Sequence, residues 1–281
     1  MSADINTVIN FLTSLFNNGL SYSAINTAQS ALSSLLMLKG VPVGSNPLVV
    51  RLLKGIFNLR PSIPKTIVTW DTDILLNYLR KLSPVRTLTL KMLSMKTAAL
   101  LWILTSQRSQ SMQMLDVRNL TVSDHSVKIR FGDTLKTTRP GFHQKEISVK
   151  AYAPDRRLCI VTVLREYLSR TKVVRKAVIG KTQLFLSYNK PFEPVSRETI
   201  ARWIRFVMLK AGLDVSMFTP HSIRAASTSA ACRYAVPMDT ILNTAGWKND
   251  CTFRKYYNKP LKVSDTTVGN SLLVNSKAGA K

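Results

Sequence analysis

The stretch TPHSIR at residues 219–224 carries the most information in this chain of 281 residues. Thr219 is a favoured helix N-cap and Pro220 a favoured first helical residue, so the stretch predicts a helix that begins here. His221 and Arg224 then lie three positions apart, on one face of the first turn. The free N–H groups and positive dipole end of a helix start favour a phosphate, to which a guanidinium offers a planar fork and an imidazole a further donor or a proton carrier. The stretch therefore predicts a phosphate-binding site.

Two aromatic features follow this stretch in the sequence. Trp247 comes directly after Gly246, and its indole N–H could hold a phosphate oxygen. One short helix later the chain carries the pair Tyr256 and Tyr257, and a positioned tyrosine can serve as a covalent nucleophile. His-x-x-Arg, Gly-Trp and tyrosine in this order suit an attack on a phosphodiester. The pattern indicates an enzyme that acts on a nucleic-acid backbone.

The charge of the chain points to the same kind of partner. Forty Lys and Arg residues against 15 Asp and Glu residues give a formal net charge of +25. Because 45% of the residues are hydrophobic and 8% are aromatic, the chain can build a core, and we expect this charge on a folded surface. A polyanion is then the leading partner. On charge alone, a ribosomal-type or simply soluble basic protein stays open as an alternative.

Other classes of protein find little support in the sequence. The richest apolar run, residues 98–104, is too short to span a membrane and predicts a buried helix. The first helix lacks a preceding basic segment of the secretory kind, so we expect an intracellular protein. Cys159, Cys232 and Cys251 show no metal-ligand spacing and are expected to be reduced thiols. We therefore expect no metal, no cofactor and no membrane partner.

Apolar periodicity predicts a mainly helical chain with one small antiparallel sheet. The break RPSIPK at residues 60–65 is the best domain boundary, because its prolines interrupt helical patterning. Apolar spacing predicts helices at residues 5–17, 21–40 and 46–57 before this break, and at 70–82, 87–104, 159–169, 196–211, 220–234, 237–244 and 250–257 after it.

The sheet is predicted from alternating residues in the middle of the chain. Residues 127–131 and 146–149 alternate as two partner strands, and residues 183–186 suggest a short third strand. The loop between the first two strands is basic and carries Lys136, which by itself is most simply a solvated lysine. On a mobile hairpin such a lysine can also protonate a leaving oxygen. His143 has no partner pattern and is expected to be an exposed loop residue.

Arg108 follows the apolar helix directly and completes the set, although in isolation it would be an ordinary solvated arginine. Arg, then Lys on a hairpin, His-x-x-Arg, Trp and Tyr in this order resemble the tyrosine recombinase, or phage integrase, family. The resemblance covers residues 66–260. It implies the following roles: Arg108 and Arg224 as the catalytic arginines, Lys136 as the general acid, His221 and Trp247 as further phosphate ligands, and Tyr257 or Tyr256 as the nucleophile.

The resemblance is imperfect at two places. The family often has an acidic residue three positions after the first arginine, whereas this chain has Ser111, so Arg108 must be oriented by another group such as Asp116 or the backbone. The commonest family spacing selects Tyr256 as the nucleophile. Recombinases of mobile elements tend to place it one residue later, which favours Tyr257 narrowly.

The resemblance also implies a domain organisation and an activity. Residues 1–62 would be a helical, SAM-like core-binding domain that clamps DNA, and residues 63–281 the catalytic domain. The expected activity is site-specific recombination of double-stranded DNA through a 3′-phosphotyrosyl intermediate, without a small-molecule substrate. A catalytically inactive, domesticated DNA-binding protein of this fold, or an enzyme like a type IB topoisomerase, stays open as an alternative.

Finer resemblances concern the origin of the chain and its assembly. The runs at residues 57–61 and 221–226 are similar to recombinases of eukaryotic mobile elements of the DIRS or Crypton kind, which implies a nuclear enzyme if the host is eukaryotic. In the family, a segment after the tyrosine docks on a neighbouring protomer and couples the active sites of a tetramer. Here Leu272, Leu273 and Val274 could fill such a pocket, while a frayed terminus is the simpler alternative.

Overall fold

The computed structural model describes residues 4–38, 40–61, 67–132, 138, 140, 145–176 and 182–262. The chain divides into two compact units, Met1–Lys65 and Thr66–Lys281, close to the predicted boundary after residue 62. Each unit has its own hydrophobic core. The two units are therefore described separately.

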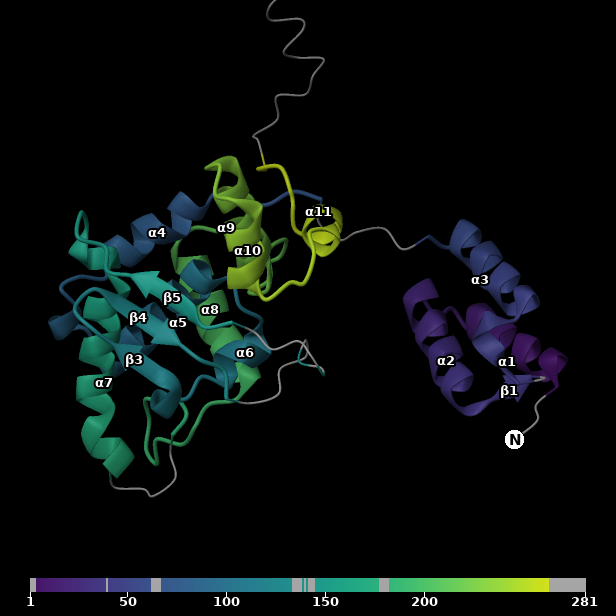
Figure 1. Cartoon of the computed structure of the whole chain (residues 1–281), viewed down its shortest axis with the longest axis horizontal. Coiled ribbons are helices and arrows are strands. Elements are labelled where there is room, and N and C mark those ends of the chain that lie inside the picture. Colours follow the sequence, from purple (N-terminus) through teal and green to yellow (C-terminus); the bar gives the residue numbers. More distant parts are fainter. Residues whose placement is uncertain are drawn as a thin grey trace, which may run out of the picture. The chain divides into compact units, whose positions relative to one another are not determined.

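The first unit is a small helical bundle (Figure 1). Its elements are α1 (Ile5–Asn17), α2 (Tyr22–Leu35), β1 (Met37–Leu38), β2 (Val41–Pro42), the 3-10 turn η1 (Val43–Ser45) and α3 (Pro47–Leu59). As predicted, Asn46 and Pro47 open the third helix, with the Asn46 side chain accepting a hydrogen bond from the backbone N–H of Leu48. The prediction that the second helix continues to residue 40 is wrong. A β1–β2 hairpin replaces its last turn, because Gly40 takes a positive φ of 78° that a helix cannot contain.

The second unit is mostly helical and is built around one buried helix (Figure 1). Its helices are α4 (Thr72–Lys81), α5 (Leu90–Thr105), α6 (Ser109–Gln113), α7 (Ile160–Lys176), α8 (Arg197–Lys210), α9 (Ser222–Arg233), α10 (Met238–Ala245) and α11 (Cys251–Tyr256), with 3-10 turns η2 (Val85–Thr87), η3 (Val117–Asn119) and η4 (Arg156–Leu158). Helix α5 is buried around most of its circumference and contacts α7, α8 and α9. Its apolar residues on all sides are what a central helix requires.

One antiparallel sheet of three strands packs against α5 and α7 (Figure 1). Its strands are β3 (Leu120–Val122), β4 (Ser126–Ile129) and β5 (Ile147–Lys150), in the order β3-β4-β5. The predicted pairing of the second and third of these strands is confirmed, with Val127 opposite Val149. The predicted strand at residues 183–186 is wrong, because Gln183 and Leu186 make only isolated bridges outside this sheet. The mainly helical fold with a small antiparallel sheet is confirmed.

Candidate active site

Helix α9 carries the centre of the candidate site, and its start differs from the prediction. The helix begins at Ser222 with His221 as its N-cap residue, so the prediction of Thr219 as N-cap is wrong. The preceding turn instead closes through backbone hydrogen bonds three residues apart, from Ser222 to Thr219 and from Arg224 to His221. Such a tight entry turn still holds His221 and Arg224 next to each other at the helix start.

Arg224 is completely buried and is fixed by two backbone carbonyls. Its Nη1 donates to the oxygen of Ser106 and its Nη2 to the oxygen of Ala245, both at 2.6 Å. Burial and the nearby positive charge of Arg108 lower the pKa of Arg224 to about 10. At neutral pH the guanidinium therefore keeps its charge inside the protein.

Small side chains on α9 make room for this arginine. The helix buries a run of Ala, Ser and Thr residues between positions 225 and 230, which lets neighbouring backbone approach it closely. The two carbonyls come from the ends of other helices: Ser106 caps α5 and Ala245 ends α10. The C-terminal end of a helix presents unpaired carbonyls and negative dipole, which suits a buried cation.

Trp247 and Tyr257 pack against the Arg224 guanidinium. The Arg224 Cζ lies 4.3 Å from the ring centroid of Trp247 and 5.3 Å from that of Tyr257. The two rings are themselves 4.7 Å apart between centroids. Gly246, with a φ of 68°, ends α10 in the left-handed region and turns the chain so that Trp247 can enter this cluster. Phe253 of α11 supports the indole from a small apolar core.

His221 faces the same tyrosine. Its Nε2 lies 3.4 Å from the Tyr257 hydroxyl oxygen. The residue is exposed as a whole, yet partial desolvation of its ring, with the charges of Arg224 and Arg108, lowers the pKa of His221 below 6.5. The imidazole is therefore mostly neutral at pH 7, when it can accept a proton.

The two tyrosines lie in different surroundings. Tyr256 is 57% exposed, with the Lys255 ammonium 5.3 Å from its ring centroid. Tyr257 is half-buried, and its backbone oxygen accepts a hydrogen bond of 2.5 Å from the Ser229 hydroxyl on α9. The structure thus brings Tyr257, and not Tyr256, to His221 and Arg224.

Arg108 lies at the edge of this cluster as the N-cap residue of α6. It is half-buried, and its positive charge contributes to the lowered pKa of both His221 and Arg224. Asp116 does not orient it, because the Asp116 carboxylate is paired with Arg118 at 2.8 Å. Among the described residues, none accepts a hydrogen bond from the Arg108 guanidinium.

Lys136 and His143 lie outside the described residues, as do the tail residues Leu272, Leu273 and Val274. The strands that flank the loop of Lys136 are described. Arg130 and Glu146 join them through an ion pair of 2.6 Å.

Two hydrogen-bond donors in the cluster have no partner. Within the described part of the chain, three buried side-chain polar atoms lack a hydrogen bond, and two of them are Arg224 Nε and Trp247 Nε1. A buried donor without an acceptor is costly, so such groups call for a bound partner. Two donors beside a buried cation suit the oxygens of an anion.

Sequence reasoning missed the groups that hold Arg224. Ser106 has a positive φ of 51°, and its hydroxyl forms a hydrogen bond of 2.7 Å with that of Ser227. The side chain of Gln107 donates to the backbone oxygen of Thr244 at 2.5 Å and so ties the end of α5 to α10. Backbone carbonyls carry no residue-type signal, and only the polar turn after the apolar helix hinted at this role.

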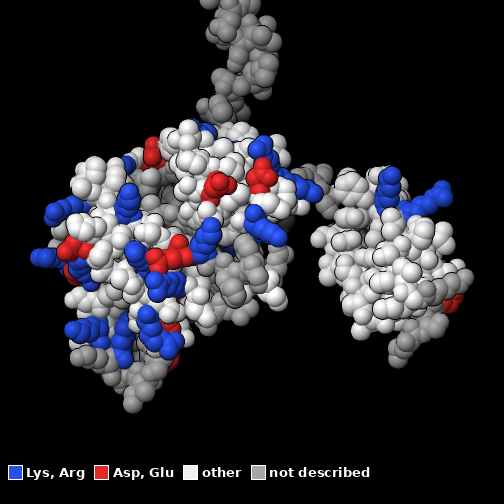
Figure 2. Space-filling model, viewed as in Figure 1, with Lys and Arg blue, Asp and Glu red and all other residues white. Residues whose placement is uncertain are grey.

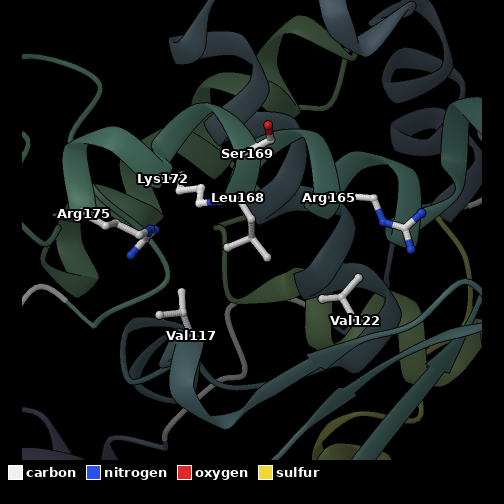
Figure 3. A pocket seen from close by; sticks show the side chains of 7 residues that line it. All are labelled: Val117, Val122, Arg165, Leu168, Ser169, Lys172 and Arg175. Carbon is white, nitrogen blue, oxygen red and sulfur yellow. The ribbon is translucent and has the colours of Figure 1, made fainter.

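One further cavity lies away from this cluster. A cavity of about 560 Å³ between α7 and the β3 region is lined by three valine or leucine side chains and by Arg165, Lys172 and Arg175 (Figure 3). It shares no residue with the cluster. In the part of the chain that the structure describes, no group of His, Cys, Asp and Glu could hold a metal ion, and no helix is long and apolar enough to cross a bilayer.

Comparisons with known proteins identify the family and the fold of the chain. The model of the phage integrase family matches residues 75–262, two thirds of the chain. The chain belongs to the phage integrase family. Its members are tyrosine recombinases, enzymes that cleave and rejoin DNA. The matched segment contains Arg108, His221, Arg224, Trp247 and both tyrosines.

Solved structures share the fold of this tyrosine recombinase. The XerH site-specific recombinase, bound to palindromic difH substrate in a post-cleavage complex, is 15% identical over 99% of this chain and 72% of that chain, with a TM-score of 0.62. The Tn1549 transposon integrase, in complex with transposon right end DNA, is 14% identical over 99% and 86%, with a TM-score of 0.58. A lambda integrase dimer bound to a COC′ core site is 15% identical over 94% and 83%, with a TM-score of 0.52. No curated protein matched the sequence.

Proposed function

We propose that this tyrosine recombinase acts at specific sites of duplex DNA, through a covalent link between Tyr257 and a 3′ phosphate. The observation that carries this proposal is the pair of unpartnered buried donors, Arg224 Nε and Trp247 Nε1, beside the Tyr257 ring. A phosphodiester would supply both acceptors and negative charge. The three solved structures named above hold DNA, which favours the same partner.

In the proposed reaction the Tyr257 hydroxyl oxygen attacks the scissile phosphorus. The bond from phosphorus to the tyrosine oxygen forms while the bond to the 5′ oxygen breaks. His221, in the tautomer that leaves Nε2 unprotonated, accepts the phenol proton across the distance of 3.4 Å. Lys136 donates a proton to the leaving 5′ oxygen. The phosphotyrosyl link keeps the energy of the phosphodiester, so rejoining to another strand needs no nucleotide cofactor.

Charge stabilisation in this scheme comes from groups that are fixed before DNA arrives. Arg224 is held by two carbonyls and cannot turn away, and Arg108 adds a second positive charge. Negative charge grows on the non-bridging oxygens as the tyrosine attacks. Preorganised donors act most strongly on charge that develops in the transition state.

The two domains expected from the sequence, residues 1–62 and 63–281, would clamp the duplex together. Arg51 and Lys54 lie exposed on α3 of the first unit. Figure 2 shows many Lys and Arg side chains on the second unit, with fewer Asp and Glu among them. Contacts of this kind go mainly to phosphates and set the position of a protein on DNA.

Assembly into a tetramer by exchange of the C-terminal tail is the finer part of the proposal. A pocket of about 230 Å³ between α5, α9 and α10 supports it, because its lining includes Leu104, Ala231, Val236 and Ile241. Leu104 is 38% exposed, so the pocket opens to the surface with an apolar wall. Such a pocket suits the apolar residues 272–274 of a neighbouring protomer. The chain would act on a mobile element, and in the nucleus if its host is eukaryotic.

A selection for covalent adducts tests the proposed chemistry without knowledge of the target site. Nicked duplexes with randomised sequence are incubated with the protein, and DNA that stays bound in denaturing detergent is recovered and sequenced. We expect wild type and Tyr256→Phe to yield adducts on a common sequence, because Tyr256 lies outside the cluster. Tyr257→Phe should yield none.

Three other outcomes would each contradict part of the proposal. Adducts with Tyr257→Phe would overturn the assignment of the nucleophile. Selective DNA binding without any adduct would mark a DNA-binding protein that has lost cleavage. Relaxation of supercoiled plasmid without sequence preference would instead favour a type IB topoisomerase.

A further inference from the structure

The dipeptide Thr69-Trp70, far away in the sequence, forms hydrogen bonds with Ser222, which follows His221, and with the segment that follows Tyr257. It lies just before α4, and both residues are almost completely buried, at 1% and 2% exposure. Neither residue belongs to the cluster that would touch DNA. Burial of a threonine and a tryptophan at this place therefore calls for another reason.

The backbone of Thr69 pairs with the segment that follows the nucleophile candidate. Its N–H donates to the oxygen of Pro260, and its oxygen accepts from the N–H of Lys262, both at 2.7 Å. These bonds form a short parallel bridge opposite Leu261, where the last described residues run beside the start of the second unit (Figure 1). The exit of the chain from Tyr257 is thereby fixed a few residues downstream.

A second contact fixes the same segment from α9. The Ser229 hydroxyl donates to the oxygen of Tyr257 at 2.5 Å and accepts from the N–H of Lys259 at 3.0 Å. Ser229 therefore holds Tyr257 through the backbone oxygen of the tyrosine, and Thr69 holds the segment that follows. A tyrosine fixed on both sides can keep its hydroxyl at one distance from His221.

Trp70 holds the histidine side of the pair. Its indole Nε1 donates to the Ser222 hydroxyl at 2.8 Å. Ser222 is the first residue of α9 and follows His221 directly. One dipeptide thus fixes the start of the histidine helix through a side chain and the end of the tyrosine segment through its backbone.

We propose that Thr69-Trp70 is a positioning element, which sets the distance between His221 Nε2 and the Tyr257 hydroxyl. The inference rests on the proposed function, since it assigns that distance a role in cleavage. It makes Trp70, Ser222 and the Lys262 N–H positioning groups that act through the pair and do not touch the substrate. The Thr69 side chain has no part in this positioning, because its hydroxyl oxygen Oγ1 has no hydrogen-bond partner.

Conservative variants separate positioning from packing. Trp70→Phe and Ser222→Ala each remove one side of the same hydrogen bond, and Ser222→Thr restores the hydroxyl. Lys262→Pro removes the N–H that bonds to Thr69, whereas Lys262→Ala keeps it. Trp203→Phe is the packing control, because Trp203 is buried in the same core, against Phe185 and Tyr188.

The first measurement is single-turnover formation of the covalent adduct, beside the Kd for DNA. Loss of one neutral hydrogen bond should lower the cleavage rate about five- to tenfold in Trp70→Phe, Ser222→Ala and Lys262→Pro. We expect an unchanged Kd, and wild-type rates in Ser222→Thr, Lys262→Ala and Trp203→Phe. The double variant Trp70→Phe with Ser222→Ala should be no slower than either single variant, because both remove one bond. A slow Trp203→Phe enzyme, or a Trp70→Phe enzyme with wild-type rate, would overturn the proposal.

The second measurement does not depend on cleavage. Histidine side-chain NMR follows the titration of His221, one of three histidines in the chain. The charged and titratable groups that face it are Arg224, Arg108 and Tyr257. If the Trp70–Ser222 bond holds the ring in its partly desolvated place beside these groups, Trp70→Phe should raise the pKa of His221 towards 6.5, and Trp203→Phe should leave it unchanged. An identical pKa in wild type and Trp70→Phe would sink the positioning role, even if wild type forms no adduct and the proposed chemistry itself fails.

Discussion

Position 224 requires an arginine, because its buried side chain is held by two carbonyl oxygens. Lysine keeps the charge at position 224 but has no planar fork, so it cannot donate to both Ser106 and Ala245 and still face a phosphate. We expect Arg224→Lys to lower the rate of adduct formation about 10²- to 10³-fold. Affinity for DNA should change little, because one phosphate contact among many is altered.

Arg233→Lys, exposed at the end of the same helix, is the matched control and should cleave at the wild-type rate. An equal loss of affinity and rate in Arg224→Lys would instead mark Arg224 as a contact that only positions DNA.

The lowered pKa of His221 predicts a pH dependence of stability. The unfolded histidine binds its proton near pH 6.5, whereas the folded one binds it at lower pH. Between these two values the unfolded state holds more protons, so the free energy of unfolding should fall as pH drops through this window. Chemical denaturation at several pH values measures the effect, and His221→Asn should remove this component. A pH dependence identical in wild type and variant would contradict it.

Residue types and their spacing predicted the side chains of the site but not the backbone groups that hold them. His221, Arg224, Trp247 and Tyr257 were predicted as one site from motif order and spacing, and the structure brings them together, while their roles stay predictions. The carbonyls that hold Arg224 and the contacts of Thr69 could not be predicted in this way. They are backbone groups, and any residue could supply them.

At the scale of elements, helix α5 buries a cation in its centre. Lys96 is completely buried, and its Nζ donates to the oxygen of Leu82, the C-cap residue of α4, at 2.6 Å. Burial lowers the pKa of Lys96 to about 8, partly offset by the negative charge of Asp155. The lysine is thus mostly charged at pH 7, at a cost to the folded state.

Lys96→Met should therefore stabilise the protein at pH 7, by on the order of 1 kcal/mol, since it removes a buried charge and keeps the volume. Wild type should gain stability as pH rises from about 8 towards 10.5, because there the unfolded state holds more protons than the folded one. The advantage of the variant should shrink over that range. Urea denaturation at pH 7 and pH 9.5 measures it, with the exposed Lys81→Met as control. A less stable variant at pH 7 would show that the bond to Leu82 outweighs the cost of burial.

The sequence predicted long helices well and short elements poorly. The third helix was set by its Asn46 cap and the following proline, which act locally. Strand β3 has three residues, too few to show alternation, and the β1–β2 hairpin ends a helix that apolar spacing alone would continue. Helix α7 reaches Lys176, beyond the predicted end near residue 169, because its last turns are held mainly by contacts that periodicity does not report.

The charge of the whole molecule is distributed unevenly between its units. Residues 1–65 hold five of the 40 Lys and Arg residues and one of the 15 Asp and Glu residues. Most of the net charge of +25 therefore belongs to the second unit. Each phosphate that the protein neutralises should contribute about 0.9 to the slope of log affinity against log salt. We expect Arg51→Gln with Lys54→Gln to reduce that slope by about 2, and the cleavage rate on bound DNA to stay unchanged. A flat salt response of wild type would contradict the phosphate clamp.

The segment after Tyr257 has two proposed roles, to hold the tyrosine in place and to dock on a neighbouring protomer. Truncation at different residues separates the two roles. The N–H of Lys262 bonds to Thr69, so a chain that ends after Lys262 keeps the contact that holds the tyrosine segment. It loses residues 272–274, the apolar residues proposed to dock on a neighbouring protomer.

We expect this truncated protein to bind one DNA site with wild-type affinity and to form the Tyr257 adduct, but to fail to join two DNA sites in one complex. Native gels and light scattering measure the joining, and denaturing gels measure the adduct. A chain that ends after Pro260 should also fail to join two DNA sites and should form the adduct about five- to tenfold more slowly, because it lacks the Lys262 N–H that bonds to Thr69. If the protein cut after Lys262 still assembles two sites, the tail does not exchange between protomers and the tetramer must form through another surface.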